Sequence, residues 1–146
     1  RSRGLGDVYK RQVLAPVRSH LHQEDLEVLP LNVHVTDWIP AHQLGDVVDL
    51  AITHGGEGTV QTSCVQGWPF IGIPLQLEQR FNVQRCAAFG SARLVSQKEA
   101  RRADWAALVR EALADDRMRS RARHMAELMK GLDGPGQAAE AICKLL

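Results

Sequence analysis

Short apolar runs alternate with longer stretches of helical period along this chain. Runs of β-branched and other apolar residues predict strands at 13–17, 31–35, 50–53, 70–73 and 92–95. Apolar residues spaced three or four apart predict helices at 59–66, 77–89, 104–113, 116–132 and 136–146. Residues 19–30 predict a loop or one short turn, and 41–44 at most a short helix.

This alternation predicts an α/β fold, a Rossmann-like parallel sheet with helices on both faces. We expect 50–53 and 70–73 to be buried strands of that sheet. Ligands of such sheets bind at the carboxyl ends of the strands. His54 and Pro74 stand at two such ends, so we expect the segments that follow them to face one crevice.

The composition is that of a soluble globular protein of one domain, with 146 residues, 45% of them hydrophobic and 24% charged. No apolar run approaches the ~20 residues that cross a membrane. Residues 1–12 differ from the rest, because their net charge of +3 leaves −2 for residues 13–146 of a chain of net +1. They resemble a translated sequencing-adapter sequence, with a native basic linker as the alternative. We expect the folded domain at 13–146. Because the positive charge is confined to residues 1–12, it does not indicate a nucleic-acid partner.

The three cysteines, Cys64, Cys86 and Cys143, form no Cys-x-x-Cys pair. Each lies in a helical pattern among apolar neighbours, which predicts buried, reduced thiols in a cytoplasmic protein. Among the histidines only His20 and His22 have a spacing typical of metal ligands, and no third ligand accompanies them. We therefore expect no metal site.

A glycine-rich segment, His54-Gly55-Gly56-Glu57-Gly58-Thr59, joins a predicted strand to a predicted helix. Glycines allow a close approach to the backbone, and the first N–H groups of a helix point at a bound anion. The segment therefore predicts a phosphate site. The structural alternative is an ordinary turn between a strand and a helix.

Further motifs flank this segment: Trp38-Ile39-Pro40 before it, then Gly67-Trp68-Pro69 and Glu78-Gln79. Together they resemble the nucleotide-sugar signature of family 1 glycosyltransferases of the GT-B fold. That family includes UDP-glycosyltransferases and bacterial macrolide and antibiotic glycosyltransferases. The resemblance covers residues 13–146, is strongest from 38 to 82, and implies the C-terminal, donor-binding domain.

The resemblance implies a role for each motif. Trp38 would stack on the base, Ala41 and Thr62 stand at base and ribose positions, and Glu78 and Gln79 would bind the sugar hydroxyls. Alternatively, Trp38 is a hydrophobic corner residue, and Glu78 with Gln79 a polar helix start. The donor diphosphate would lie on His54, Gly55, Gly56, Gly58 and Thr59.

Three positions depart from the family pattern. Many members have Gln where this chain has Ala41 and Glu where it has Thr62, and plant members often have Asn where it has Gly58. The departures point to a bacterial-type member. They leave the choice between UDP and TDP open.

The implied function is that of an inverting, metal-independent glycosyltransferase, which transfers a hexose from a UDP- or TDP-sugar to an acceptor hydroxyl. The acceptor and the catalytic base would belong to an absent N-terminal domain, so we expect no catalytic residue, no cofactor and no activity in this chain alone. One alternative is a stand-alone subunit that a partner chain completes. Another, a nucleotide-sugar epimerase, is disfavoured by the Trp-x-Pro and Glu-Gln spacing. Acceptor and sugar stay open.

Overall fold

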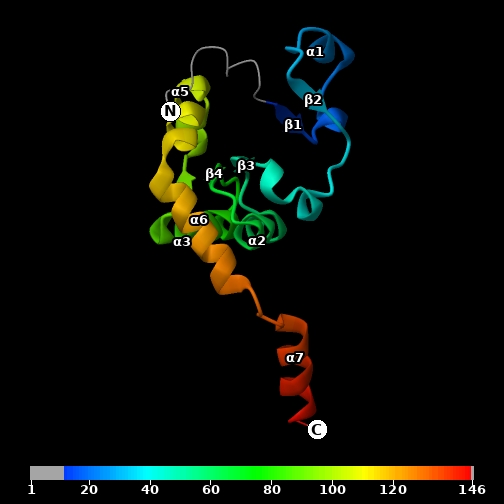
Figure 1. The fold of residues 1–146 in the computed structure, drawn as a ribbon. Coiled ribbons are helices and arrows are strands. Elements are labelled where there is room, and N and C mark those ends of the chain that lie inside the picture. The colour runs from blue at the N-terminus through cyan, green and yellow to red at the C-terminus, as the bar shows by residue number, and fades with distance from the viewer. Residues whose placement is uncertain (1–11, 146) are drawn as a thin grey trace. The chain divides into compact units, whose positions relative to one another are not determined.

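A computed structural model describes residues 12–145 (Figure 1), and these divide into two compact units with the boundary between Ala41 and His42. Each unit has its own parallel sheet, of two strands in the first and three in the second. No helix within residues 12–145 combines the length and apolar character needed to cross a bilayer.

The first unit is built on strands β1 (Val13–Ala15) and β2 (Val33–Val35), which pair in parallel with Val13 opposite Val33. Both lie within the predicted strands and are shorter. A 3-10 turn at Arg18–His20 and a helix, α1 (Gln23–Glu27), connect them. The prediction of a loop or one turn at 19–30 missed this helix. It is stabilised locally, because the Asp25 carboxylate accepts the His22 N–H at 2.9 Å.

The predicted non-native tail at 1–12 lies outside the described residues, apart from Gln12. The side-chain oxygen of Gln12 contacts the Nε2 atom of His34 at 2.5 Å.

The second unit is built on strands β3 (Ala51–Thr53), β4 (Phe70–Gly72) and β5 (Ala92–Leu94), which pair in parallel in that order. Helices cover both faces of this sheet. On one face Phe70 packs with residues of α2 (Glu57–Gln66) and α3 (Leu77–Phe89). On the other, Ile71 packs with residues of α5 (Trp105–Ala114) and α6 (Asp116–Met129). The predicted α/β class with a parallel sheet is therefore confirmed, although its strands form two sheets.

The two middle strands differ in burial. All three residues of β4 are buried, as predicted. The prediction of a buried strand at 50–53 is wrong, because three of these residues are only half-buried and Ile52 is 52% exposed. In the sheet of the second unit β3 is an edge strand, so Ile52 has β4 on one side only.

The main helices begin and end within a few residues of their predicted bounds. Gly67 and Gly90 end α2 and α3 in the left-handed conformation, with φ of 71° and 93°. A short helix, α4 (Gln97–Ala100), was not predicted. Its signal is the sequence Ser96-x-x-Glu99, in which Ser96 Oγ accepts the Glu99 N–H while the Glu99 carboxylate accepts the Ser96 N–H.

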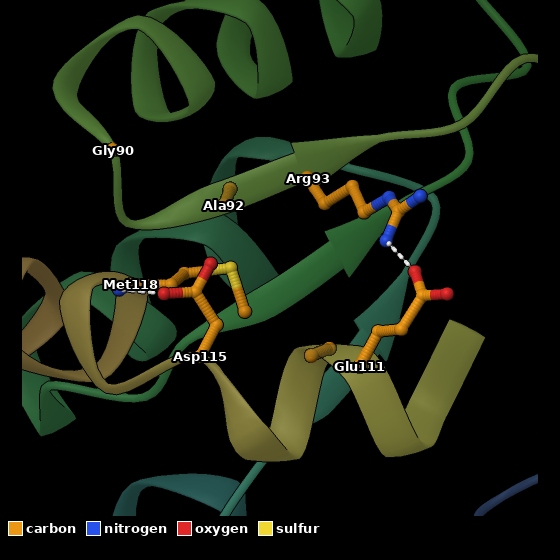
Figure 2. Close-up of a pocket in the computed structure, with 7 residues that line it drawn as sticks. Gly90, Ala92, Arg93, Glu111, Asp115 and Met118 are labelled. Carbon is orange, nitrogen blue, oxygen red and sulfur yellow. Dashed lines mark hydrogen bonds and ion pairs between the residues drawn. The ribbon is translucent and has the colours of Figure 1, made fainter. Parts of the chain in front are cut away.

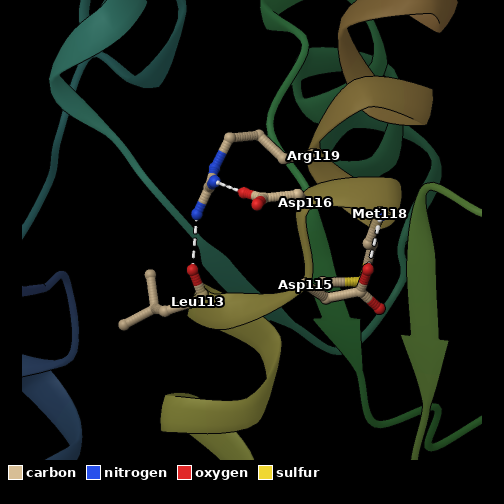
Figure 3. A network of polar contacts seen from close by, with 5 residues as sticks. All are labelled: Leu113, Asp115, Asp116, Met118 and Arg119. Carbon is tan, nitrogen blue, oxygen red and sulfur yellow. Dashed lines mark hydrogen bonds and ion pairs between the residues drawn. The ribbon is translucent and has the colours of Figure 1, made fainter. Parts of the chain in front are cut away.

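Asp115 forms the corner between α5 and α6 (Figure 3). It follows α5 directly, and its carboxylate accepts the Met118 N–H at 2.9 Å, which caps α6. Arg119 tightens the corner, because its guanidinium binds Asp116 at 2.5 Å and the Leu113 carbonyl.

The last helix, α7 (Gly134–Cys143), begins before its predicted start at 136. The sequence 133–136 reads as a helix breaker, but Asp133 accepts the Gly136 N–H at 2.9 Å and Pro135 suits the first turn of a helix. The breaker is therefore an N-terminal cap. Short 3-10 turns at Ala41–Gln43 and Gly45–Val47 agree with the expectation of at most a short helix at 41–44.

Candidate functional site

The glycine-rich segment connects β3 to α2. Gly56 is the N-cap residue of α2, and no side chain caps this end of the helix. The first backbone bond of the helix runs from the Val60 N–H to the Gly56 carbonyl at 3.0 Å. The earlier N–H groups have no partner inside the helix, so this end can donate hydrogen bonds to an anion.

Two threonines fix the shape of this loop. Thr53 Oγ1 accepts the Gly55 N–H at 3.2 Å and donates to Thr59 Oγ1 at 2.8 Å. Thr59 Oγ1 donates in turn to the Gly56 carbonyl at 2.9 Å. The helix begins at Glu57, two residues before its predicted start, so Thr59 lies inside the first turn rather than at its cap.

His54 lies at the mouth of this helix. Its side chain is exposed, and a Cβ atom built on Gly56 would lie 2.6 Å from the His54 Nε2 atom. A side chain at position 56 would make the exposed His54 ring rotate away from this place. The imidazole and the N-cap of α2 are therefore neighbours, as a shared anion site requires.

A second group of predicted residues lies at the start of α3. Glu78 is exposed in the first turn. Gln79 is buried, with an exposed fraction of 8%, and its Oε1 atom accepts the N–H groups of Leu75 and Gln76 at 2.9 and 3.2 Å. The Gln79 side chain thus holds the turn that leads into α3, which agrees with the structural alternative of a polar helix start.

The loop and the start of α3 meet at Gly55. Gly55 is buried with φ of +88°, and a Cβ atom there would lie 2.4 Å from Val83 Cγ2 and 3.0 Å from the Gln79 carbonyl oxygen. Asn82 adds a hydrogen bond from Nδ2 to the Gly55 carbonyl at 3.2 Å. The structure therefore brings the phosphate-loop and sugar-motif residues together, and it adds Asn82, to which the sequence assigned no role.

The remaining predicted site residues lie further along α2 or belong to the first unit. Thr62 is on α2, and its hydroxyl donates to the Gly58 carbonyl at 2.8 Å. Trp38 and Ala41 belong to the first unit. The Trp38 side chain is 71% exposed, and its carbonyl accepts the Thr36 hydroxyl at 3.2 Å. An exposed indole is available to stack on a flat ring.

Two pockets of the second unit are lined by residues outside the glycine-rich segment. One lies between β5 and α5, where Arg93 and Glu111 point toward each other and form an ion pair of 2.8 Å (Figure 2). Another is lined by Gln97, Lys98, Arg101 and Arg102. Among residues 12–145, no three His, Cys, Asp or Glu side chains gather as metal ligands would.

Two of the cysteines are neighbours on the helices that carry the candidate site. Cys64 on α2 and Cys86 on α3 have Sγ atoms 3.9 Å apart. The hydrogen bond from the Cys64 thiol lowers the pKa of Cys86 to about 7, and the same contact raises the pKa of Cys64. The expectation of three buried thiols holds for Cys86 only, because Cys64 is half-buried and Cys143 is exposed on α7.

The parallel sheet, its two helical layers and the glycine-rich start of α2 define the C-terminal part of a GT-B glycosyltransferase. Over residues 6–145 the chain matches the family described as erythromycin biosynthesis protein CIII-like, C-terminal domain, and it belongs to that family. The predicted resemblance is thereby confirmed.

Relatives of known activity share this segment. The chain is 32% identical to demethyllactenocin mycarosyltransferase of Streptomyces fradiae, over 84% of this chain and 26% of the relative. It is 30% identical to oleandomycin glycosyltransferase of Streptomyces antibioticus, over 96% of this chain and 33% of the relative. The crystal structure of the calicheamicin glycosyltransferase CalG4 matches with a TM-score of 0.77 and 26% identity, over 90% of this chain and 33% of that one. The chain thus spans a third or less of these proteins.

Proposed function

We propose that this chain is the donor-binding part of an inverting, metal-independent glycosyltransferase. It would hold a UDP- or TDP-sugar while a hexose is transferred to an acceptor hydroxyl. The observation that carries the proposal is the meeting of an uncapped helix N-terminus, at Gly56, with an exposed carboxylate, Glu78, across the buried Gly55. One element suits a diphosphate and the other suits sugar hydroxyls.

In this proposal the chain stabilises the leaving group. When the acceptor oxygen attacks the anomeric carbon, negative charge develops on the departing diphosphate. The N–H groups at the start of α2, the helix dipole and the His54 imidazole would receive that charge. Gly55, Gly56, Gly58 and Thr59 would surround the diphosphate, as the family resemblance implies.

The base and the sugar would lie at opposite ends of the donor. Trp38 would stack on uracil or thymine, with Ala41 and Thr62 near the base and ribose, while Glu78 and Gln79 would bind the sugar. Because Gln79 Oε1 already accepts two backbone N–H groups, its contribution would come from the Nε2 amide hydrogens. The general base that activates the acceptor would come from a second domain outside this chain.

Calorimetric titration of the 146-residue chain with UDP and with TDP tests the proposal. We expect saturable binding of at least one of the two. A chain that melts cooperatively but binds neither nucleotide at concentrations up to the millimolar range would exclude a donor-binding role.

A further inference from the structure

Asn82 connects the two halves of the candidate site. It lies on α3 one turn after Glu78, and its Nδ2 atom donates both to the Gly55 carbonyl at 3.2 Å and to Glu78 Oε1. One side-chain amide thus contacts the loop before α2 and the carboxylate at the start of α3.

The chemistry of the two partners restricts what this position can hold. A backbone carbonyl and an ionised carboxylate are both acceptors only. The carboxamide NH₂ of Asn82 carries two hydrogens and can serve both acceptors at once. An aspartate of the same shape offers only acceptors and would face Glu78 with a like charge.

The contact with Gly55 also sets the direction of a backbone donor. The peptide between Gly55 and Gly56 is planar and trans, so its carbonyl and its N–H point in opposite directions. Because the carbonyl points at Asn82, the Gly56 N–H points away from α3. Gly56 is the N-cap of α2, where donors for an anion are expected.

The contact with Glu78 fixes a side chain that is otherwise exposed. Its Oε1 atom is held by Asn82, and within the described residues Oε2 has no hydrogen-bond partner. A carboxylate with one oxygen held and the other available loses little rotamer freedom when it binds a hydroxyl.

We propose that Asn82 is a positioning residue that couples the diphosphate site to the sugar site through the Gly55 carbonyl and the Glu78 carboxylate. The inference rests on the proposed donor-binding function. It predicts that Asn82 affects the binding of the bare nucleotide and also the additional affinity that an attached sugar brings.

The test is a thermodynamic cycle on the full 146-residue chain. Dissociation constants for UDP, TDP, UDP-glucose and TDP-glucose are measured for wild type, Asn82→Ala, Glu78→Ala and the double variant. The sugar increment is the ratio of the constants for nucleotide and nucleotide sugar. Gln84→Ala, which removes an exposed carboxamide from the same helix, is the matched control.

We expect Asn82→Ala to raise the dissociation constant of the bare nucleotide by about 3- to 10-fold, as for the loss of one hydrogen bond. It should also lower the sugar increment to that of Glu78→Ala, with no further fall in the double variant, because both changes remove the same fixed carboxylate. Gln84→Ala should match wild type in both quantities.

Each contrary outcome has its own meaning. A wild type that binds none of the four compounds removes the proposed function. Wild-type nucleotide affinity and sugar increment in Asn82→Ala overturn the coupling and leave the function intact. The coupling is also overturned if Asn82→Ala binds the bare nucleotide more weakly but keeps the wild-type sugar increment. It is overturned as well if the wild type shows no sugar increment. Should the alanine variant melt without cooperativity, Asn82→Asp keeps the volume of the side chain and must show the same two losses.

Discussion

Gly55, in the loop before α2, and Gly58, in the first turn of α2, differ in how much space their surroundings leave for a side chain. Gly55 has φ of +88°, and a Cβ atom there would meet Val83 Cγ2 at 2.4 Å. A Cβ atom on Gly58 would have no atom within 4 Å, and its φ is not positive. Only the first position therefore needs glycine for the fold itself.

Gly55→Ala should lower the free energy of unfolding by about 1–3 kcal/mol, since it combines a strained φ with a clash against α3. Gly58→Ala is the matched control and should leave it unchanged or slightly higher, because alanine is the better helix former. Urea denaturation of both variants measures the difference. Equal free energies of unfolding for the two variants would show that α3 can shift away from a Cβ atom at position 55 at little cost.

His54 tests the diphosphate half of the site. His54→Ala should weaken UDP and UDP-glucose alike, by about 1–2 kcal/mol if one hydrogen bond is lost. The physical reason is that the ring lies beside Gly56 at the mouth of α2, where every nucleotide would place its phosphates. Titration calorimetry measures both ligands, with His20→Ala, an exposed histidine of the first unit, as control. A loss confined to UDP-glucose would assign His54 to the sugar instead.

At this scale the binding roles of the candidate residues stay predictions, while the contacts of their side chains can be compared with the structure. The glycines and His54 could be identified because a strand, a glycine run and a helix follow one another in the chain. The task of Gln79 had a local signal, the capping-box spacing Gln76-x-x-Gln79, which was overlooked. The task of Asn82 could not be predicted, because its amide reaches a carbonyl 27 residues away. Such contacts exist only once α3 packs against the loop.

Helices α2 and α3 pack side by side against the sheet, and their inner faces bring Cys64 and Cys86 together (Figure 1). The Sγ atoms are 3.9 Å apart, and they would have to approach to about 2.05 Å to form a disulfide. The two thiols would lose two protons and two electrons to an added oxidant such as diamide, which takes them up as it is reduced.

We expect diamide to convert the chain into a form lighter by two hydrogen atoms, in which only Cys143 still reacts with iodoacetamide after unfolding. The rate should rise as the pH passes about 7, because the thiolate of Cys86 is the attacking form. Mass spectrometry measures both effects. Cys143→Ser should behave like wild type, and Cys64→Ser should abolish the product. Crosslinks through Cys143 alone would contradict the geometry.

The sequence also predicted the elements unevenly. Long helices were found within a few residues of their bounds, as at 104–113, where the apolar period is clear and α5 spans Trp105–Ala114. The four-residue α4 was missed because it has no period, although its cap sequence Ser96-x-x-Glu99 was visible. The exposure of Ile52 could not be predicted, because an apolar run does not reveal whether its strand lies at a sheet edge.

For the whole molecule, the conclusions that can be drawn depend on the fraction of each relative's length that this chain covers. It spans 26% of one glycosyltransferase and 33% of another. Fold and family follow from that segment, since an α/β domain carries its own core. The catalytic activity does not follow from that segment, because an enzyme with its active site in a cleft between domains takes its reacting groups from both sides of the cleft.

The final prediction concerns catalysis by the isolated chain. We expect it to bind a nucleoside diphosphate but to transfer no sugar. The exposed His54 lies at the mouth of α2, where it would face phosphate oxygens and so be poorly placed to deprotonate an acceptor. The assay incubates the purified chain with UDP-glucose or TDP-glucose and a set of acceptor alcohols, and follows products by mass spectrometry. His54→Ala is the control for contaminating enzyme. Turnover by the wild type that this variant abolishes or lowers would show that this chain transfers sugar by itself, which contradicts the prediction.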